Sequence, residues 1–464
     1  MPKSPKKTLI IKTVSTFIMI LLFASILLFA ANYRFIVSDH IYEGVYVGET
    51  PVGGLSPEAA AAKISIDFQT RTSQPLKIIY QDHQWPIAAN KINLTIDASA
   101  LAQNAFQVGR TGNLFFRMKQ RYLSLNQNIT IPLSPSLDKE LLQSILVKLA
   151  KTVDQEPQNA TFRFRGSSIV ITPEQIGRKT NIPRALKEIS DKLATNFSFT
   201  YQLPVDAAAP DIAAKDYEGI DGVIASYTTH FSTVDANRTQ NIIIASNELN
   251  GTLIRSGSTF SFNSVIGPRL AQHGYKQAPV FIGGKLVPDW GGGVCQVSTT
   301  LYNAALLADM SITERTSHFS PPGYVPLGHD ATVADNQLDF KFVNNSPTSI
   351  YIISRVSGGQ ITVEILGKRD DNAPDIVIVA TNKKEIEYNV VKKQDPEIEL
   401  GKEVIEDPGH KGFLVTTYRV KTRNGQEISR EFLAADEFPP ADKIIKVGTK
   451  IPSTVPLPAV KPIK

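Results

Sequence analysis

The sequence predicts a multidomain α+β protein that begins with an apolar helix and ends in an elongated all-β module. Its 464 residues are enough for about three domains of ordinary size. The 29 prolines and 29 glycines favour many turns and extended segments over a bundle of helices. Apolar residues change from mixed spacing in the first part of the chain to alternation near its C-terminus. We therefore expect several separate cores.

Residues 1–34 are expected to form a cytoplasmic tail and a transmembrane anchor. Four lysines precede the uncharged run of residues 13–33, which ends at Arg34. As a helix with a rise of 1.5 Å per residue, this run spans about 31 Å, enough for the hydrocarbon core of a bilayer. The lysines should stay in the cytoplasm and the bulk of the chain outside it. Cleavage of a signal peptide near the sequence FAAN is the alternative.

Residues 35–210 are predicted to form two similar α+β units in tandem. The stretch WPIAANKINLTIDASALAQNA aligns without gaps with IVITPEQIGRKTNIPRALKEI, so that Asp97 lies over Asn181. Each copy is predicted to hold a short strand, a turn, an apolar patch and an amphipathic helix. A further helix is expected after Ser56, as N-cap, and Pro57, in its first turn. We find no cluster of nucleophile, base and orienting group here, which favours binding or spacer modules.

The C-terminal part, residues 369–450, alternates apolar and polar residues and is predicted to be all-β. Asn424 and Gly425 stand between two such runs, and this pair is a strong signal for a hairpin turn. The Pro-rich tail, residues 451–464, is expected to be extended or disordered.

The central region, residues 211–368, contains the single cysteine of the chain, Cys295, between three glycines and a predicted helix. Glycines allow a sharp turn that exposes backbone amides. At a helix N-terminus, unpaired amides and the helix dipole lower the pKa of a thiol. The amides around Gly292, Gly293 and Cys295 are also candidates for binding the oxyanion formed when a thiolate attacks a carbonyl. The alternative is a buried cysteine that only packs, with the glycines serving a tight turn.

A histidine is the best candidate for the base that such a thiol requires. The region offers four: His230, His273, His318 and His329. His318 lies in the turn-rich stretch ERTSHFSPPGYVPLGHDATV, where a loop can aim it at the helix start. Asp330 follows shortly and is the first candidate to orient the imidazole, with Asp339 and Glu314 as alternatives.

Charge and motif content argue against several functional classes. The net charge of +5 is small, and the basic residues are scattered, so a nucleic-acid partner is not expected. One cysteine without a closely spaced histidine pair gives no metal site, and no nucleotide-binding motif occurs, so no cofactor is expected. The oligomeric state is not indicated.

Residues from about 215 to 367 resemble the VanW family. The motifs FSFN, GPR, GYKQAP, GGGVCQVSTTLYNA, ERTSH and GHDATV follow in the family's order. The duplicated segment resembles the peptidoglycan-binding domain that often precedes VanW, and residues 369–450 are similar to the wall-associated module named for its five glycines. The resemblance implies a mixed α/β VanW domain within a Gram-positive cell-envelope protein.

The same resemblance implies L,D-transpeptidation of peptidoglycan, with Cys295 as nucleophile and His318 as base. The partners are then peptidoglycan stem peptides and glycan. Five further residues are expected to contact substrate: Gln296, Ser298, Thr299, Tyr302 and Arg315. Two alternatives stay open, a non-catalytic wall-binding protein linked to glycopeptide susceptibility and a cysteine peptidoglycan hydrolase.

Overall fold

The computed structural model describes residues 13–27, 38–166, 168–282 and 285–450, which form two compact units. The first unit contains described residues up to 158 together with residues 175–210. The second contains residues 159–174 and the described chain from residue 211 onward. The segment 159–174 thus belongs to the second unit, although the sequence places it in the duplicated region.

The expected transmembrane segment is not supported by the structure. Residues 13–27 form a helix, and the rest of the expected span, residues 28–33, lies outside the described residues. Within the described part of the chain, no helix is both long enough and apolar enough to cross a bilayer.

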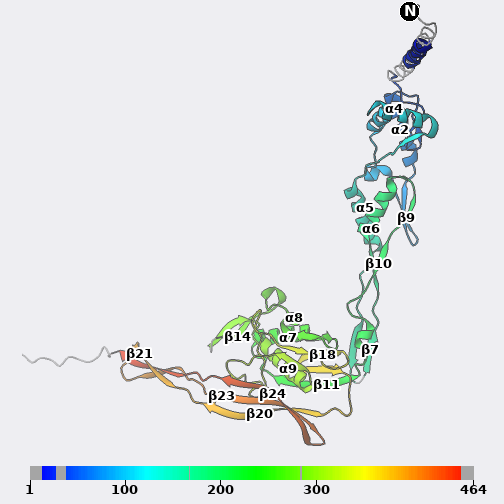
Figure 1. Ribbon diagram of the computed structural model, residues 1–464. Coiled ribbons are helices and arrows are strands. Elements are labelled where there is room, and N and C mark those ends of the chain that lie inside the picture. Colours follow the sequence, from blue (N-terminus) through cyan, green and yellow to red (C-terminus); the bar gives the residue numbers. More distant parts are fainter. Residues whose placement is uncertain (1–12, 28–37, 167, 283–284, 451–464) are drawn as a thin grey trace, which may run out of the picture. The chain divides into compact units, whose positions relative to one another are not determined.

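The first unit combines short sheets with helices (Figure 1). One sheet has the order β2-β1-β5 and another the order β4-β3-β9, while β8 pairs with β10. The strands are β1 (Val45–Val47), β2 (Thr50–Pro51), β3 (Leu76–Tyr80), β4 (His83–Ile87), β5 (Ile129–Ile131), β8 (Gly177–Thr180), β9 (Thr200–Gln202) and β10 (Val205–Ala208). The helices are α2 (Pro57–Thr72), η1 (Ala89–Ile92), α3 (Ala98–Gln107), α4 (Leu114–Gln127), α5 (Lys139–Val153) and α6 (Ile182–Leu193).

The helix starts follow local sequence signals. The Ser56 hydroxyl accepts a hydrogen bond from the backbone N–H of Ala59, and Pro57 occupies the first turn of α2. Asp97 caps α3, and Asn181 caps α6 in the same way, as the alignment of the two copies predicts.

The two sequence copies interlock instead of folding as separate tandem units. Leu76 and Ile78, from the hairpin β3–β4 of the first copy, share a core with Ala185 and Ile189, from helix α6 of the second copy. Helix α3 packs in a different core, with β1 and α2. The second copy's hairpin, β6 (Thr161–Arg165) with β7 (Ser168–Thr172), packs on the second unit, where Phe162 contacts Tyr351.

The second unit is built on a four-stranded antiparallel sheet of order β11-β19-β18-β12. Its strands are β11 (Gly222–His230), β12 (Leu253–Ile254), β18 (Ile350–Ser357) and β19 (Gln360–Gly367). Helices α7 (Ala236–Leu249) and α9 (Val294–Leu307) lie against this sheet (Figure 1). Because the sheet is antiparallel, the domain is α+β, not the mixed α/β type expected from the sequence.

Smaller elements complete this domain. The sheet β13-β17-β16 and the hairpin β14–β15 are both antiparallel. The elements are η2 (Ala214–Tyr217), β13 (Thr259–Ser261), α8 (Phe262–Ile266), η3 (Ala271–His273), β14 (Gln277–Ile282), β15 (Lys285–Trp290), β16 (Ser311–Glu314) and β17 (Lys341–Val343).

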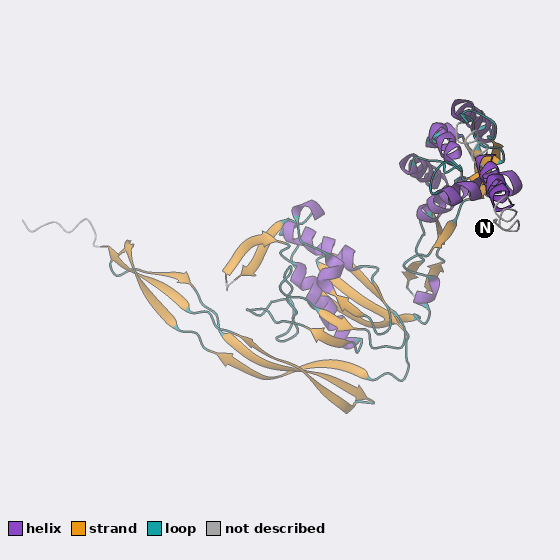
Figure 2. Ribbon diagram, turned by 45° about the horizontal axis from the view of Figure 1, so that its top comes forward, coloured by secondary structure: helices purple, strands orange, loops and turns teal. Residues whose placement is uncertain are grey.

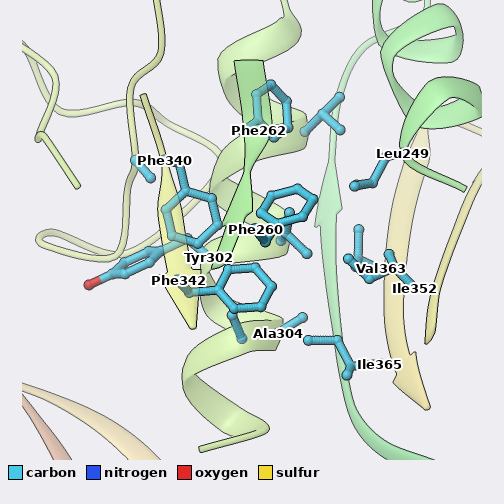
Figure 3. Packing of buried hydrophobic residues seen from close by; sticks show 14 of the residues in the cluster. Leu249, Phe260, Phe262, Tyr302, Ala304, Phe340, Phe342, Ile352, Val363 and Ile365 are labelled. Carbon is cyan, nitrogen blue, oxygen red and sulfur yellow. The ribbon is translucent and has the colours of Figure 1, made fainter. Parts of the chain in front are cut away.

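Helix α9 is enclosed by core on nearly all sides. Figure 3 shows the rings of Tyr302, Phe340 and Phe342 close together, with Ala304 of α9 beside Phe342. The rings of Tyr302 and Phe340 meet edge to face, with centroids 5.6 Å apart. A close-packed interior of this kind permits little movement, so the start of α9 is held in place.

The C-terminal module is all-β and elongated, as the sequence predicts (Figure 2). Two sheets, of order β20-β23-β24 and β21-β25-β22, form it. The strands are β20 (Asp375–Ile386), β21 (Val390–Glu399), β22 (Glu403–Asp407), β23 (Gly412–Arg423), β24 (Gln426–Phe438) and β25 (Lys443–Lys450). Asn424 and Gly425 turn the chain between β23 and β24 with φ angles of 52° and 78°, which confirms the predicted hairpin. The tail at 451–464 lies outside the described residues.

The C-terminal module packs on the domain that contains α9. The guanidinium of Arg419, on β23, donates to the backbone oxygen of Met310 at 2.8 Å. Lys421 pairs with Asp309 in the turn that follows α9. These two contacts join the first sheet of the module to the C-terminal end of the buried helix.

Candidate active site

Cys295 is the second residue of helix α9, directly after the glycine turn. Gly291 and Gly293 have φ angles of 78° and 107°, which favour glycine over other residues. Gly292 presses against β14, since a Cβ atom there would lie 2.8 Å from the Ala278 oxygen. The three glycines therefore permit both the sharp entry into α9 and the close approach to β14.

His318 and Asp330 meet beside the thiol. Asp330 Oδ2 accepts a hydrogen bond from the backbone N–H of His318 at 2.6 Å. The same oxygen lies 2.7 Å from His318 Nδ1. The His318 imidazole also interacts with the Cys295 thiol, whose sulfur lies 3.5 Å from Thr332 Oγ1 and 3.4 Å from the Val333 oxygen. Because Nδ1 is engaged by Asp330, Nε2 is the ring nitrogen left for sulfur. Cys295, His318 and Asp330 thus lie in a chain of contacts of the kind that a nucleophile, a base and an orienting carboxylate require.

The electrostatics of this group favour a thiolate next to an imidazolium. Burial alone would raise the pKa of the Cys295 thiol, but the hydrogen bond and the charge of His318 outweigh it and lower the pKa to about 7. Burial would lower the pKa of His318, but hydrogen bonds to Asp330 and Cys295 raise the pKa to about 9. Between these values the pair carries opposite charges, as a reactive cysteine requires.

Asp330 is held from behind by Arg315. Its side chain is only 1% exposed, and Arg315 Nη2 lies 3.2 Å from Asp330 Oδ1. Arg315 Nε also donates to the Asp330 backbone oxygen at 2.6 Å, and Arg315 Nη1 pairs with Asp436 of the C-terminal module. Burial raises the pKa of the Asp330 carboxyl, but the bond to His318 and the charge of Arg315 lower it overall.

Four of the five residues expected to contact substrate lie in the scaffold beneath the site. Ser298, Thr299 and Tyr302 are fully or nearly buried in α9, and Arg315 is buried behind Asp330. Ser298 Oγ donates to the Ala331 oxygen at 2.6 Å, and Thr299 Oγ1 accepts from the Ala331 N–H at 3.0 Å. Ser298 and Thr299 therefore join α9 to the chain segment that carries Asp330.

A cavity of about 1110 Å³ opens in front of Cys295 and His318. Gly292 and Gly293 belong to its wall, and their amides and that of Cys295 donate to no other described residue. These amides are thus available to an oxyanion at the mouth of the helix. Gln296 also reaches this wall, although its side chain is buried and hydrogen-bonded.

The cavity wall contains residues that the sequence analysis did not single out. Arg238 comes from α7, Arg269 from the loop before η3, and Tyr324 from the loop after His318. Burial raises the pKa of Tyr324, and the nearby Cys295 charge adds to this. Arg269 lies in the GPR motif, which could have marked it, whereas Arg238 and Tyr324 lie in none of the six motifs.

The other candidate bases and carboxylates do not contact the thiol–imidazole pair. Asp339 accepts from Ser261 and Asn263, and Glu314 accepts from the backbone N–H of Asp339. Burial and neighbouring cations lower the pKa of His329 to about 4. Among the described residues, no group of three or more His, Cys, Asp or Glu side chains is arranged to hold a metal ion.

Three protein-family models match separate parts of the chain. Residues 237–366 match the family described as "VanW like protein", residues 85–200 match "Putative peptidoglycan binding domain", and residues 377–450 match "G5 domain".

Two named proteins and a solved domain are similar to parts of this chain. "Uncharacterized protein YoaR" of Bacillus subtilis is 31% identical over 242 residues, which cover 52% of this chain and 79% of that protein. "Vancomycin B-type resistance protein VanW" of Enterococcus faecalis is 28% identical over 159 residues, 33% of this chain and 58% of that protein. A solved G5 domain of an IgA1 protease is 23% identical and covers 17% of this chain and 96% of that one, with a TM-score of 0.14.

Proposed function

The chain belongs to the VanW family, and we propose that it is a cell-wall protein whose Cys295 catalyses L,D-transpeptidation between peptidoglycan stem peptides. The observation that carries the proposal is the chain of contacts from Cys295 through His318 to Asp330 at the edge of a cavity. A buried packing cysteine needs neither an imidazole partner nor a lowered pKa.

The first half of the reaction forms a thioester. The Cys295 thiolate attacks the carbonyl carbon of the third residue of a donor stem peptide, and the carbonyl oxygen becomes an oxyanion. The free amides of Gly292, Gly293 and Cys295 stabilise that oxyanion. The imidazolium of His318 then gives its proton to the departing nitrogen, so the amide bond breaks and the terminal D-amino acid leaves.

The second half forms the cross-link. An amine on a neighbouring stem attacks the thioester carbonyl, and the now neutral His318 accepts the proton that the amine loses. Collapse of the tetrahedral intermediate breaks the carbon–sulfur bond and makes a new amide. The thiolate and the imidazolium return to their starting state, so the cycle needs no external energy source or cofactor.

The other domains supply the polymer to the site under this proposal. The region at 85–200 matches a peptidoglycan-binding family, and the G5 domain is joined to the catalytic domain through Arg419 and Arg315. Attachment of such modules to the wall raises the local concentration of strands near Cys295.

A non-catalytic role is the second candidate, and the same matches favour it. A protein with a peptidoglycan-binding domain and a G5 domain has enough binding surface to act as a wall-bound partner of other enzymes. The similarity to a vancomycin resistance protein connects this alternative to glycopeptide susceptibility.

Mass spectrometry of purified disaccharide tetrapeptides tests these alternatives. The chain from residue 38 onward is incubated with the muropeptides beside its Cys295→Ala variant, with His273→Gln as a matched control at an exposed histidine outside the cavity wall. Dimers joined through third-position residues, formed only when Cys295 is present, support transpeptidation. Trimmed monomers indicate a hydrolase, and unchanged peptides beside an active reference enzyme would leave the binding role.

A further inference from the structure

Arg238 places a positive charge in the wall of the Cys295 cavity without a carboxylate partner of its own. It lies in the first turn of α7 and lines the same cavity as the thiol. The other arginine of that wall, Arg269, forms an ion pair with Asp335. Among the described residues, no carboxylate oxygen lies within 4.0 Å of the Arg238 guanidinium. Arg238 is therefore the wall arginine whose charge is free to meet a ligand.

The guanidinium is held in one position. Arg238 Nη2 donates to Gln296 Oε1 at 2.7 Å. Gln296 is fixed in turn, because its Nε2 donates to Thr229 Oγ1 and to the His230 oxygen, both at 2.9 Å. Gln296 directly follows Cys295 in helix α9, so the arginine and the thiol share one rigid support. A cation held in this way loses little further freedom when it binds an anion.

The position of Arg238 is close to the reacting atoms. A Cβ atom on Gly293 would lie 3.0 Å from Arg238 Cγ, so the arginine stem packs against the glycine turn. Burial lowers the pKa of Arg238, and the negative charges of Tyr324, Asp235 and Cys295 oppose this effect. Arg238 and Cys295 thus line one cavity and are near enough for their charges to interact.

We propose that Arg238 is an anion subsite that binds the C-terminal carboxylate of the donor peptide next to the scissile bond. The inference rests on the proposed function, in which a single amino acid leaves from the donor. In such a donor, only one nitrogen and one Cα separate the attacked carbonyl from the free carboxylate. Arginine binds carboxylates through paired N–H donors, and Nη1 and Nε are not used by Gln296.

The subsite predicts a preference for the length of the donor stem peptide. A donor with one residue beyond the scissile bond places its carboxylate beside Arg238, whereas a donor with two such residues places a neutral peptide group there. The guanidinium then has no anion to bind, because the terminal carboxylate of the longer donor lies one residue beyond it. Tetrapeptide stems are therefore expected to be preferred over pentapeptide stems as donors.

Two small alkylating reagents test the anion subsite without any turnover. Iodoacetate and iodoacetamide both react with the thiolate, so the ratio of their rate constants cancels any change in the thiolate fraction. In Arg238→Gln, the rate constant for iodoacetate divided by that for iodoacetamide should fall at least about threefold. A fall of this size is expected when a nearby unit charge is removed at a partly solvated site. Arg355→Gln is the matched control, since Arg355 is exposed on β18 and pairs with Glu364. An unchanged ratio in Arg238→Gln would overturn the subsite.

A second measurement uses the wild-type protein and so does not depend on folding of the variant. Protection of Cys295 from iodoacetamide is compared between a tetrapeptide stem and the same stem with an amidated C-terminus. We expect the free acid to protect at a concentration at least about fivefold lower. Equal protection by both would overturn the assignment of the terminal carboxylate to Arg238. Loss of the iodoacetate preference in Arg238→Gln without protection by either stem would uphold the anion subsite and overturn its assignment to this donor.

Discussion

Replacement of His318 by glutamine should raise the pKa of the Cys295 thiol by about two units. The hydrogen bond and the positive charge of His318 hold that pKa at about 7, against an ordinary value of 9.0. Without them, burial favours the neutral thiol and is opposed only by the smaller effects of Val333 and Thr332, so the pKa should rise to about 9.0. Two units correspond to about 3 kcal/mol, and at pH 7 the thiolate fraction falls from about one half to about one hundredth.

The pH dependence of iodoacetamide alkylation measures this change. The rate constant for wild type should rise with pH around a midpoint near 7, since the thiolate is the reactive form. The two proteins are compared by the midpoints of their pH profiles and not by their rates at one pH. A thiolate of higher pKa is also a better nucleophile, so a single rate would mix two effects. His273→Gln should keep the wild-type midpoint. If His318→Gln also alkylates with a midpoint near 7, the imidazole does not activate the thiol and the reasoning fails.

Three further outcomes are expected from the same geometry. The rate of transpeptidation should rise as the pH passes about 7 and fall above about 9, because His318 then loses the proton that the leaving amine needs. A rate that still increases at about pH 10 would contradict this role of His318. Gly292→Ala should destabilise the protein by about 1–3 kcal/mol in urea titration, because the added Cβ would lie 2.8 Å from the Ala278 oxygen, and an unchanged unfolding midpoint would show that the turn can move. Asp436→Asn should cost about 3 kcal/mol, because it removes one of two carboxylates from a buried arginine, whereas Glu427→Gln, at an exposed pair on the same strand, should change stability by less than about 0.5 kcal/mol.

Local signals in the sequence predicted local structure well. Ser56 and Asn181 start helices because their side chains accept from nearby backbone amides, a bond that depends on a few adjacent residues. Asn424 and Gly425 form a hairpin turn for a similar reason, since their backbone angles suit that turn. The position of Cys295 at the start of α9 followed from the glycines before it and the apolar spacing after it.

Packing between distant segments could not be predicted in this way. The interlocking of the two copies depends on which helix covers the hairpin β3–β4, and both copies carry suitable apolar faces. In α9, nearly all side chains are buried, so helical spacing gave no way to separate Tyr302 in the core from Gln296 at the cavity. Arg238 reaches the site from α7, and no local pattern near Cys295 points to it.

Asp330 is linked to the C-terminal module through Arg315. A buried guanidinium is costly to desolvate unless its donors are paired, and Arg315 meets this need with Asp330 on one side and Asp436 on the other. Glu437 and Pro439, which follow Asp436 in the chain, also contribute to the cavity wall. A chain that ends before β20 would lose Asp436. Arg315 would then pair with Asp330 only, and water could reach the guanidinium. The charge balance that holds Asp330 against His318 would then change, so the activity of Cys295 should be measured with the G5 domain attached.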